Sequence, residues 1–312
     1  MKILYIAGYG RSGSTILDII LGNHSQIVST GEVNYLLDDW QAENRVCSCG
    51  KPYNQCEFWK DFFHKRPSWS REKRLVRKIE HLPYLPFLWW GLVPVSERET
   101  YRSFQRELFD YIASRGQAQK SIVLDSSKSA PNTTGRALAL KEIAGLDVFM
   151  IHLVRGGLAT LDSMLLTGSN RAIEGYSRKK KPSAFRTTMV WMNANISAWL
   201  VGKRLGVGRY MFLRYEDFIA EPETVLQSIG EFGGFDAQEL VEKVRENQSF
   251  LVGHIVGGNR VRFQKEILLR RDYSWIQGER LMKFDRVVFN LLGGWLDRKY
   301  GYNADPGIRK DT

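Results

Sequence analysis

The chain has 312 residues and a formal net charge of +11, with 43% hydrophobic and 25% charged residues. This composition is typical of a globular protein with a full core, as one large α/β domain or two small ones. The positive charge indicates an anionic partner such as nucleic acid, a membrane surface or a phosphorylated cofactor. No apolar run approaches the about 18 residues that cross a bilayer. Because Gly8, Gly10 and Arg11 interrupt the first apolar run too early for a secretory signal, we expect a cytoplasmic protein.

Short β-rich runs alternate with helical patterns along most of the chain. The pattern predicts strands over 2–7, 27–30, 121–125, 148–154 and 209–214, and helices over 14–21, 134–143, 158–166 and 222–232. Apolar residues at helical spacing predict two more helices, over 183–205 and 281–300. Strands that alternate with helices favour an α/β fold with a P-loop-like, mostly parallel sheet and helices on both faces. We expect one domain over 1–312.

A long insertion, residues 40–115, separates the second and third predicted strands. Its aromatic stretch 81–95 is too short and too rich in proline to span a membrane. Long insertions beside a cofactor loop often carry binding residues, so we expect the insertion to form an acceptor-binding or lid subdomain. Its first part holds Cys47, Cys49 and Cys56, which would make a zinc site if His64 supplied a fourth ligand; reduced thiols in a compact loop are the simpler alternative.

Residues 3–15, ILYIAGYGRSGST, join an apolar strand to a glycine-rich turn and the start of a helix. Backbone N–H groups converge in such a turn, and the helix dipole favours an anion there. Gly8 and Gly13 have the spacing of a Walker A loop, but Ser14-Thr15 stands where that loop needs Lys-Ser/Thr. The basic residue comes earlier, at Arg11.

Polar side chains follow the other predicted strands at the edge where ligands bind to an open parallel sheet. The second strand leads to Glu32, the third to Asp125-Ser126-Ser127-Lys128, and the fifth to Arg214-Tyr215-Glu216-Asp217. The fourth leads to Arg155, and Ser163 follows about two helical turns later, so this pair suits a second phosphate. Together the five loops predict one anion-binding site.

These blocks resemble those of sulfotransferases. GRSGST is similar to the family's 5′-phosphosulfate loop, and LVRGGLATLDSML to its 3′-phosphate element, in which Arg and Ser are likewise eight apart. GEVNYL resembles the Gly-Glu segment of tyrosylprotein sulfotransferases, while LDSSKSAPN and HIVGGNRVRF resemble segments of bacterial members. Gly156-Gly157 departs from the more usual Asp-Pro or Asp-Gly after the arginine.

The resemblance implies a reaction and a role for each matching residue. The donor would be 3′-phosphoadenosine 5′-phosphosulfate (PAPS), with adenosine 3′,5′-bisphosphate (PAP) as product and without a metal ion in the reaction. Glu32 would be the general base, with Arg11 and Lys128 at the transferring group. The implied donor-binding residues are Arg11, Ser12, Gly13, Ser14, Thr15, Arg155, Ser163, Tyr215, Arg260 and Arg262. The acceptor would be a hydroxyl or amine of a small molecule, glycan or lipid.

Two other classes of function remain at this stage. A kinase or NTPase with a degenerate P-loop would use Asp125 as its Walker B aspartate and bind ATP with Mg²⁺. A nucleic-acid-binding protein is suggested only by the charge, and the basic residues are scattered rather than gathered in a stripe with stacking aromatic residues. We therefore expect no nucleic-acid partner and no transmembrane segment.

Overall fold

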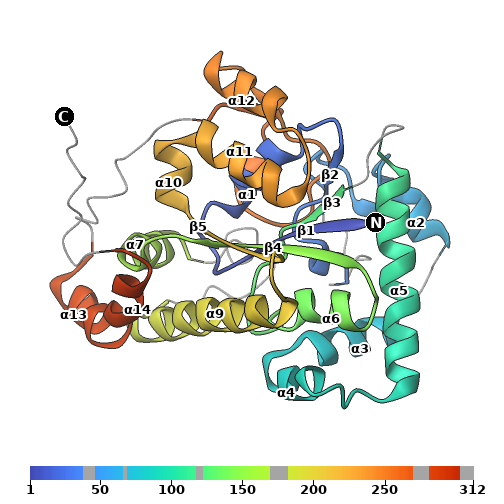
Figure 1. The fold of residues 1–312 in the computed structure, drawn as a ribbon, viewed down its shortest axis with the longest axis horizontal. Coiled ribbons are helices and arrows are strands. Elements are labelled where there is room, and N and C mark those ends of the chain that lie inside the picture. The colour runs from blue at the N-terminus through green and yellow to red at the C-terminus, as the bar shows by residue number, and fades with distance from the viewer. Residues whose placement is uncertain (38–45, 66–68, 117–121, 169–181, 270–280, 303–312) are drawn as a thin grey trace.

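The computed structural model describes residues 1–37, 46–65, 69–116, 122–168, 182–269 and 281–302. Its centre is a five-stranded sheet in the order β2-β3-β1-β4-β5, in which all neighbours are parallel (Figure 1). The strands are β1 (Lys2–Ala7), β2 (Ile27–Ser29), β3 (Ile122–Asp125), β4 (Asp147–Val154) and β5 (Tyr210–Arg214). The predicted mostly parallel α/β sheet is confirmed.

Side chains alternate between the two faces of β1, and each face has its own apolar core. Ile3 and Tyr5 belong to one buried cluster, and Leu4 and Ile6 belong to the other. Because helices cover both faces, β1 is a nearly continuous apolar run rather than an alternating one, as is usual for parallel strands.

The helices form two layers around this sheet (Figure 1). One layer contains α1 (Ser14–Leu21), α10 (Tyr215–Ala220), α11 (Pro222–Gly233) and α12 (Gln238–Arg245); the other contains α3 (Ser70–Glu80), α5 (Val95–Ser114), α6 (Arg136–Glu142) and α9 (Ala184–Leu205). The remaining helices are α2 (Lys60–Lys65), α4 (Leu85–Trp89), α7 (Gly157–Thr167), α13 (Lys283–Leu292) and α14 (Gly294–Lys299). Short 3-10 turns η1 to η4 cover Val33–Leu37, Tyr53–Gln55, Leu82–Tyr84 and Arg260–Phe263, and β6 (Phe250–Leu251) pairs with β7 (Glu266–Ile267).

The helix predicted over 183–205 is confirmed as α9, whereas the single helix predicted over 281–300 is wrong. The region instead forms two helices, α13 and α14, with Gly293 between them. A Cβ at Gly293 would lie 2.9 Å from Cγ2 of Thr188 on α9. The helix is therefore interrupted where the backbone packs closely against α9, at a glycine, which is itself a poor helix former.

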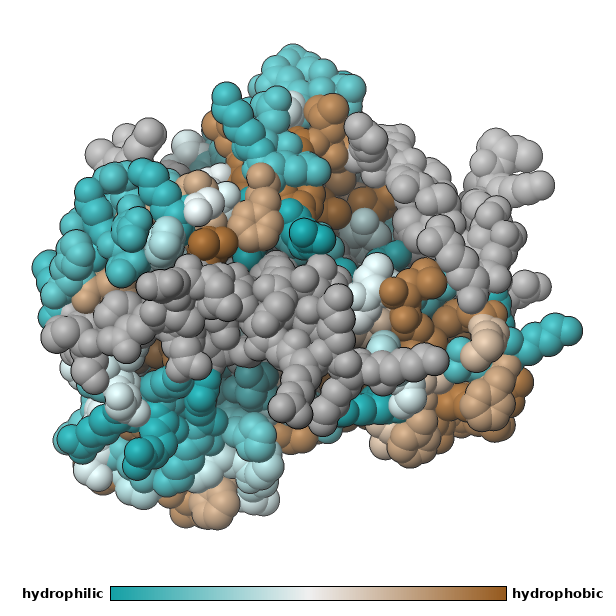
Figure 2. Space-filling model, turned by 180° about the vertical axis from the view of Figure 1, so that it is seen from behind, coloured by the Kyte–Doolittle hydropathy of each residue, from teal (hydrophilic) through white to brown (hydrophobic). Residues whose placement is uncertain are grey.

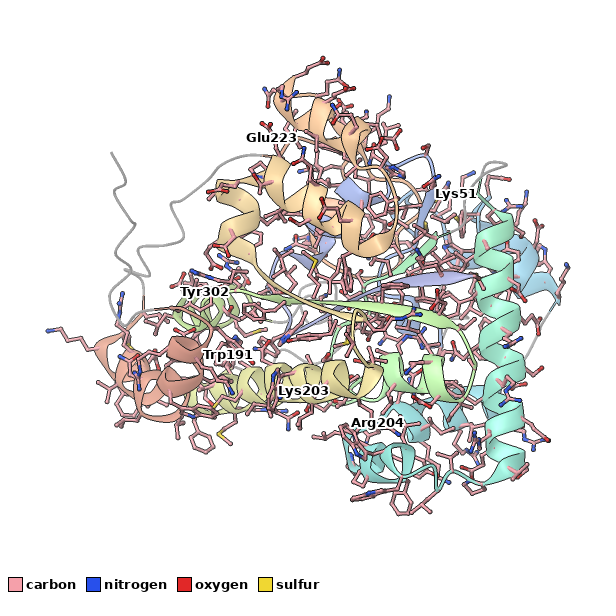
Figure 3. The ribbon with its side chains drawn as sticks, in the orientation of Figure 1. Lys51, Trp191, Lys203, Arg204, Glu223 and Tyr302 are labelled. Atoms are coloured by element: carbon pink, nitrogen blue, oxygen red, sulfur yellow. The ribbon has the colours of Figure 1, made fainter. Side chains whose placement is uncertain are left out.

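The aromatic stretch 81–95 forms η3 and α4. It lines a cavity of about 340 Å³ together with Ile143, after α6, and Arg204, near the end of α9. Both α6 and α9 end where the chain turns back into β4 and β5, so this cavity lies toward the amino ends of the strands. The Arg204 guanidinium lies 5.9 Å from the ring centre of Trp89, and Figure 3 shows Arg204 at the end of α9 nearest α4. A role for this stretch in acceptor binding remains a prediction.

Apolar side chains are exposed where α13 and α14 lie, at the right-hand end of the molecule in Figure 2. The exposed residues are Phe284, Val287, Leu291 and Trp295. Within the described ranges, no helix combines the length and apolar character needed to cross a membrane.

Candidate active site

The loop between β1 and α1 has a backbone that few residues other than glycine can adopt. Gly8 and Gly13 have φ of 117° and 88°, and Arg11 has φ of 70°. A Cβ at Gly8 would lie 2.2 Å from the carbonyl oxygen of Leu153, and one at Gly13 would lie 2.2 Å from the Tyr215 ring. The Gly13 carbonyl accepts the first hydrogen bonds of α1, from Ile16 and Leu17. We call residues 8–15 the phosphate loop; its tight turn at a helix start is the geometry of an anion-binding backbone.

Arg155 packs against the phosphate loop, whereas the guanidinium of Arg11 donates to the carbonyl oxygen of Gly168, just after α7, over 2.6 Å. Nη1 of Arg155 donates to the carbonyl oxygen of Arg11 over 3.1 Å, and its guanidinium lies 5.3 Å from the centre of the Tyr215 ring. Burial, followed by repulsion from Arg155, lowers the pKa of Arg11, and burial also lowers the pKa of Arg155. A bound anion would stabilise both buried positive charges and offset their mutual repulsion. Arg11 and Arg155 are therefore suited to bind a phosphate or sulfonate group.

Ser12 gives a second indication of an anionic ligand at this loop. Its side chain is buried, and its hydroxyl makes no hydrogen bond within the described part of the chain. Buried hydroxyl groups nearly always have a partner. Ser14, the first residue of α1, is buried beside it.

Glu32 and Lys128 form a buried ion pair between Oε1 and Nζ. Glu32 follows β2, and its backbone N–H donates to Val256 over 2.7 Å. Lys128 follows β3 with φ of 67°; its N–H donates to Ile6 of β1, and the Tyr5 hydroxyl donates to its carbonyl oxygen. The sequence motifs placed both residues at one site, but they did not predict that the two side chains form an ion pair.

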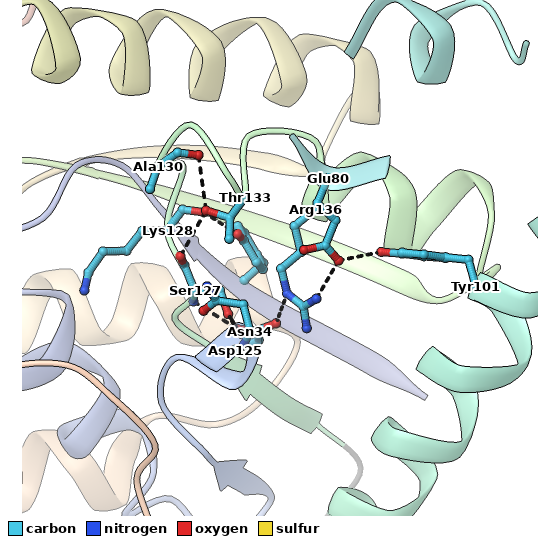
Figure 4. Close-up of polar contacts among 10 residues, drawn as sticks. Asn34, Glu80, Tyr101, Asp125, Ser127, Lys128, Ala130, Thr133 and Arg136 are labelled. Atoms are coloured by element: carbon cyan, nitrogen blue, oxygen red, sulfur yellow. Dashed lines mark hydrogen bonds and ion pairs between the residues drawn. The ribbon is translucent and has the colours of Figure 1, made fainter. Parts of the chain in front are cut away.

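A buried network holds the backbone that precedes Lys128 (Figure 4). Arg136 donates to Oδ2 of Asp125 over 2.8 Å and to Oε1 of Glu80 over 2.6 Å, and the hydroxyl of Tyr101 donates to the same Glu80 oxygen. The other Asp125 oxygen accepts from the N–H of Ser127 over 2.9 Å. Figure 4 shows Lys128 extending away from this network.

The network also assigns a structural role to Asp125. Burial opposes the charge of Arg136, but Asp125 and Glu80 hold its pKa well above the usual value; burial raises the pKa of Glu80. The aspartate that a kinase would need for Mg²⁺ is therefore engaged in an ion pair with Arg136. Sequence reasoning missed Glu80, Tyr101 and Arg136, because nothing in their local pattern distinguishes them from ordinary helix residues.

The segment with Arg260 and Arg262 reaches the start of α1 through its backbone. The N–H of Asn259 donates to Oγ1 of Thr15 over 3.0 Å, and the Asn259 side chain caps η4 by accepting from Val261 over 3.1 Å. Arg262 is buried and Arg260 is exposed, so only Arg262 points inward. The Thr15 hydroxyl thus accepts a hydrogen bond from this segment, and its predicted role toward phosphate remains a prediction.

Ser163 lies half-buried in α7, two turns after Arg155. Two carboxylates cap the start of α7. Glu216, in the first turn of α10 after β5, accepts from the N–H of Gly156 over 3.0 Å, and Asp297, which sequence reasoning did not single out, accepts from the N–H of Gly157 over 2.9 Å. Burial raises the pKa of Asp297 to about 7. Figure 3 shows Tyr302, whose hydroxyl contacts Glu216, near α7.

Comparisons with known proteins identify the family and the fold. The profile of the sulfotransferase family matches residues 4–239. The fold is similar to the sulfotransferase domain of the Synechococcus PCC 7002 olefin synthase, with 19% identity over 97% of this chain and 95% of that chain and a TM-score of 0.53. It is also similar to the sulfotransferase domain from the curacin biosynthetic pathway, with 16% identity over 96% of this chain and 97% of that chain and a TM-score of 0.54.

A comparison with curated proteins found no significant match. The family match spans the phosphate loop, Glu32, Lys128, Arg155 and Tyr215. It favours a sulfotransferase over a kinase or NTPase. The chain belongs to the sulfotransferase family, whose enzymes transfer a sulfuryl group.

Proposed function

We propose that this enzyme transfers the sulfuryl group of PAPS to a hydroxyl or amine of a small-molecule, glycan or lipid acceptor, with Glu32 as the general base. The observation that carries the proposal is the buried pair of Glu32 and Lys128 at the strand edge that also bears the phosphate loop. A carboxylate that accepts a proton and an ammonium that stabilises negative charge are the two groups that such a transfer needs.

The described residues fit the proposed donor. The phosphate loop from Ser12 to Thr15 would hold the 5′-phosphosulfate, with Arg11 at the sulfonate. The repulsion between the buried charges of Arg11 and Arg155 and the buried Ser12 hydroxyl support an anion there. Arg155 and Ser163 would bind the 3′-phosphate, while Tyr215, Arg260 and Arg262 would complete the nucleotide site.

In the proposed step, Glu32 accepts the proton of the acceptor as a new bond forms between the acceptor oxygen or nitrogen and sulfur. The bond from sulfur to the 5′-phosphate oxygen breaks, and its electron pair stays on that oxygen. Protonation removes the negative charge of Glu32 and so weakens its attraction to Lys128. Lys128 can then donate to the oxygen that gains charge. The remaining contribution of the protein is positioning and charge stabilisation, as in phosphoryl transfer.

The test begins with binding. Titration calorimetry with PAP and with ATP–Mg²⁺ should give binding to PAP alone; binding of ATP–Mg²⁺ without PAP would contradict the proposed donor. A panel of glycans, lipids and small hydroxyl or amine compounds with radiolabelled PAPS then identifies an acceptor for kinetics.

The base is tested with Glu32→Gln, which keeps the size of the side chain but cannot accept the proton. We expect turnover to fall by about 10²–10⁴-fold, the usual contribution of a general base, with PAP affinity retained. Glu223→Gln is the control, since Glu223 pairs with Arg245 on the exposed surface of α11 and α12. Turnover of Glu32→Gln close to that of the control would refute the assignment.

A further inference from the structure

The three cysteines of the insertion meet a histidine from a distant part of the chain. Candidate ligand atoms of Cys47, Cys49, Cys56 and His254 all lie within 4.8 Å of one another. Sγ of Cys49 and Sγ of Cys56 are 3.7 Å apart, and Nδ1 of His254 lies 3.2 Å from Sγ of Cys56 and 3.7 Å from Sγ of Cys47. His64, the ligand suggested by sequence, is instead exposed on α2.

These separations suit one tetrahedral ion. Bonds of about 2.3 Å to sulfur and about 2.0–2.1 Å to nitrogen place neighbouring ligand atoms about 3.5–3.8 Å apart. Three sulfurs and one imidazole nitrogen form a donor set typical of structural zinc, and tetrahedral sulfur-rich sites select zinc over hard cations. An iron–sulfur cluster spreads its protein ligands over several iron atoms and would need a wider arrangement.

Cys47 and Cys49 lie on a closed backbone turn. The N–H of Cys47 donates to the carbonyl oxygen of Lys51 over 2.9 Å. The turn closes through Gly50, whose φ is 81° and whose N–H donates to the Cys47 carbonyl over 2.9 Å. The turn therefore holds the first two cysteines close to each other in the folded chain.

We propose that Cys47, Cys49, Cys56 and Nδ1 of His254 bind a structural Zn²⁺ ion that fastens the insertion to residues 253–259. All four positions belong to the protein, so the ion has no open coordination site and takes no part in the reaction. The inference rests on this cluster alone and holds whether or not PAPS is the donor.

The proposed ion would hold a segment that contacts the active site. Around the cluster, Ser48 donates its N–H to Ile255 over 3.1 Å, and its hydroxyl accepts from the Ile255 N–H over 2.7 Å. The next residue, Val256, forms two backbone hydrogen bonds beside Gly31: its N–H donates to Thr30, and its carbonyl oxygen accepts from Glu32. A Cβ at Gly258 would lie 2.8 Å from Oγ1 of Thr15 and 3.6 Å from Oε1 of Glu32. Zinc here would therefore fix the backbone behind both Glu32 and the phosphate loop.

The test measures metal on untagged protein, because a histidine tag would bind zinc itself. Elemental analysis of protein purified with a thiol reductant should find one zinc per chain. His254→Asn should lose most of it, while His64→Asn, the matched control on α2, should keep it. Equal zinc in the two variants, or wild-type protein that neither carries zinc nor takes it up after reduction, would overturn the proposal.

A second measurement does not depend on how well the variants fold. Wild-type protein treated with a strong chelator should melt at a lower temperature and recover when Zn²⁺ is added. Co²⁺ in its place should give the intense visible absorption of a tetrahedral thiolate complex. An intact mass lower by two hydrogens in protein isolated without reductant, with no response to metal, would indicate a disulfide and refute the site.

Discussion

Replacement of Arg136 by methionine tests whether the buried network supports the active-site edge. The side chain of Arg136 is 1% exposed, and those of its partners Glu80 and Asp125 are 2% and 0% exposed. Arg136→Met leaves two carboxylates buried without their common cation. Removal of one partner from a buried ion pair typically costs about 3–5 kcal/mol. We expect a loss of that size in the free energy of unfolding.

The assay is reversible urea unfolding of Arg136→Met beside Arg245→Met. Arg245 also pairs with a carboxylate, but it is 60% exposed, so the same substitution there should cost at most about 1 kcal/mol. The double variant Arg136→Met/Glu80→Gln should recover part of the loss, since it removes one of the stranded charges. The reasoning fails if Arg136→Met is no more destabilised than Arg245→Met.

Two further predictions concern the phosphate loop and a buried acid. Gly13→Ala should weaken PAP binding measured by calorimetry, because its Cβ would lie 2.2 Å from the Tyr215 ring. The control is Gly91→Ala, since Gly91 also has a positive φ but no atom would lie within 4 Å of its Cβ, so this variant should bind PAP normally. Equal PAP affinities of the two variants would contradict the role of Gly13. Burial raises the pKa of Asp18 in α1 to about 7, whereas an unfolded aspartate titrates near about 3.9. The folded state therefore binds this proton more tightly than the unfolded state does. The contribution of protonated Asp18 to the free energy of unfolding is complete below about pH 4, and it falls by up to about 1.4 kcal/mol per pH unit as the pH rises to about 7. Asp18→Asn should thus gain in melting temperature relative to wild type between about pH 5 and about pH 8, and a constant difference would rule this out.

Local patterns were sufficient for most of the sheet and for the phosphate loop. Residues 2–7 and 14–21 were predicted with the observed bounds, because an apolar run, a glycine turn and a helix start are all encoded by near neighbours. The carboxyl ends of parallel strands lie along one edge of the sheet. This rule was enough to predict that Glu32, Lys128 and Arg155 belong to one site. The break at Gly293 could not, since it depends on a contact with α9.

Long-range partners were decided only by the tertiary structure. The pairing of Lys128 with Glu32, and of Asp125 with Arg136 and Glu80, depends on which strand and helix ends become neighbours in the folded chain. The histidine beside the cysteines shows the same limit, because spacing favoured the nearby His64 whereas the fold brought His254 from about 200 residues away. Periodicity and motifs report on short stretches of chain, whereas ion pairs and ligand clusters form between side chains that packing brings together.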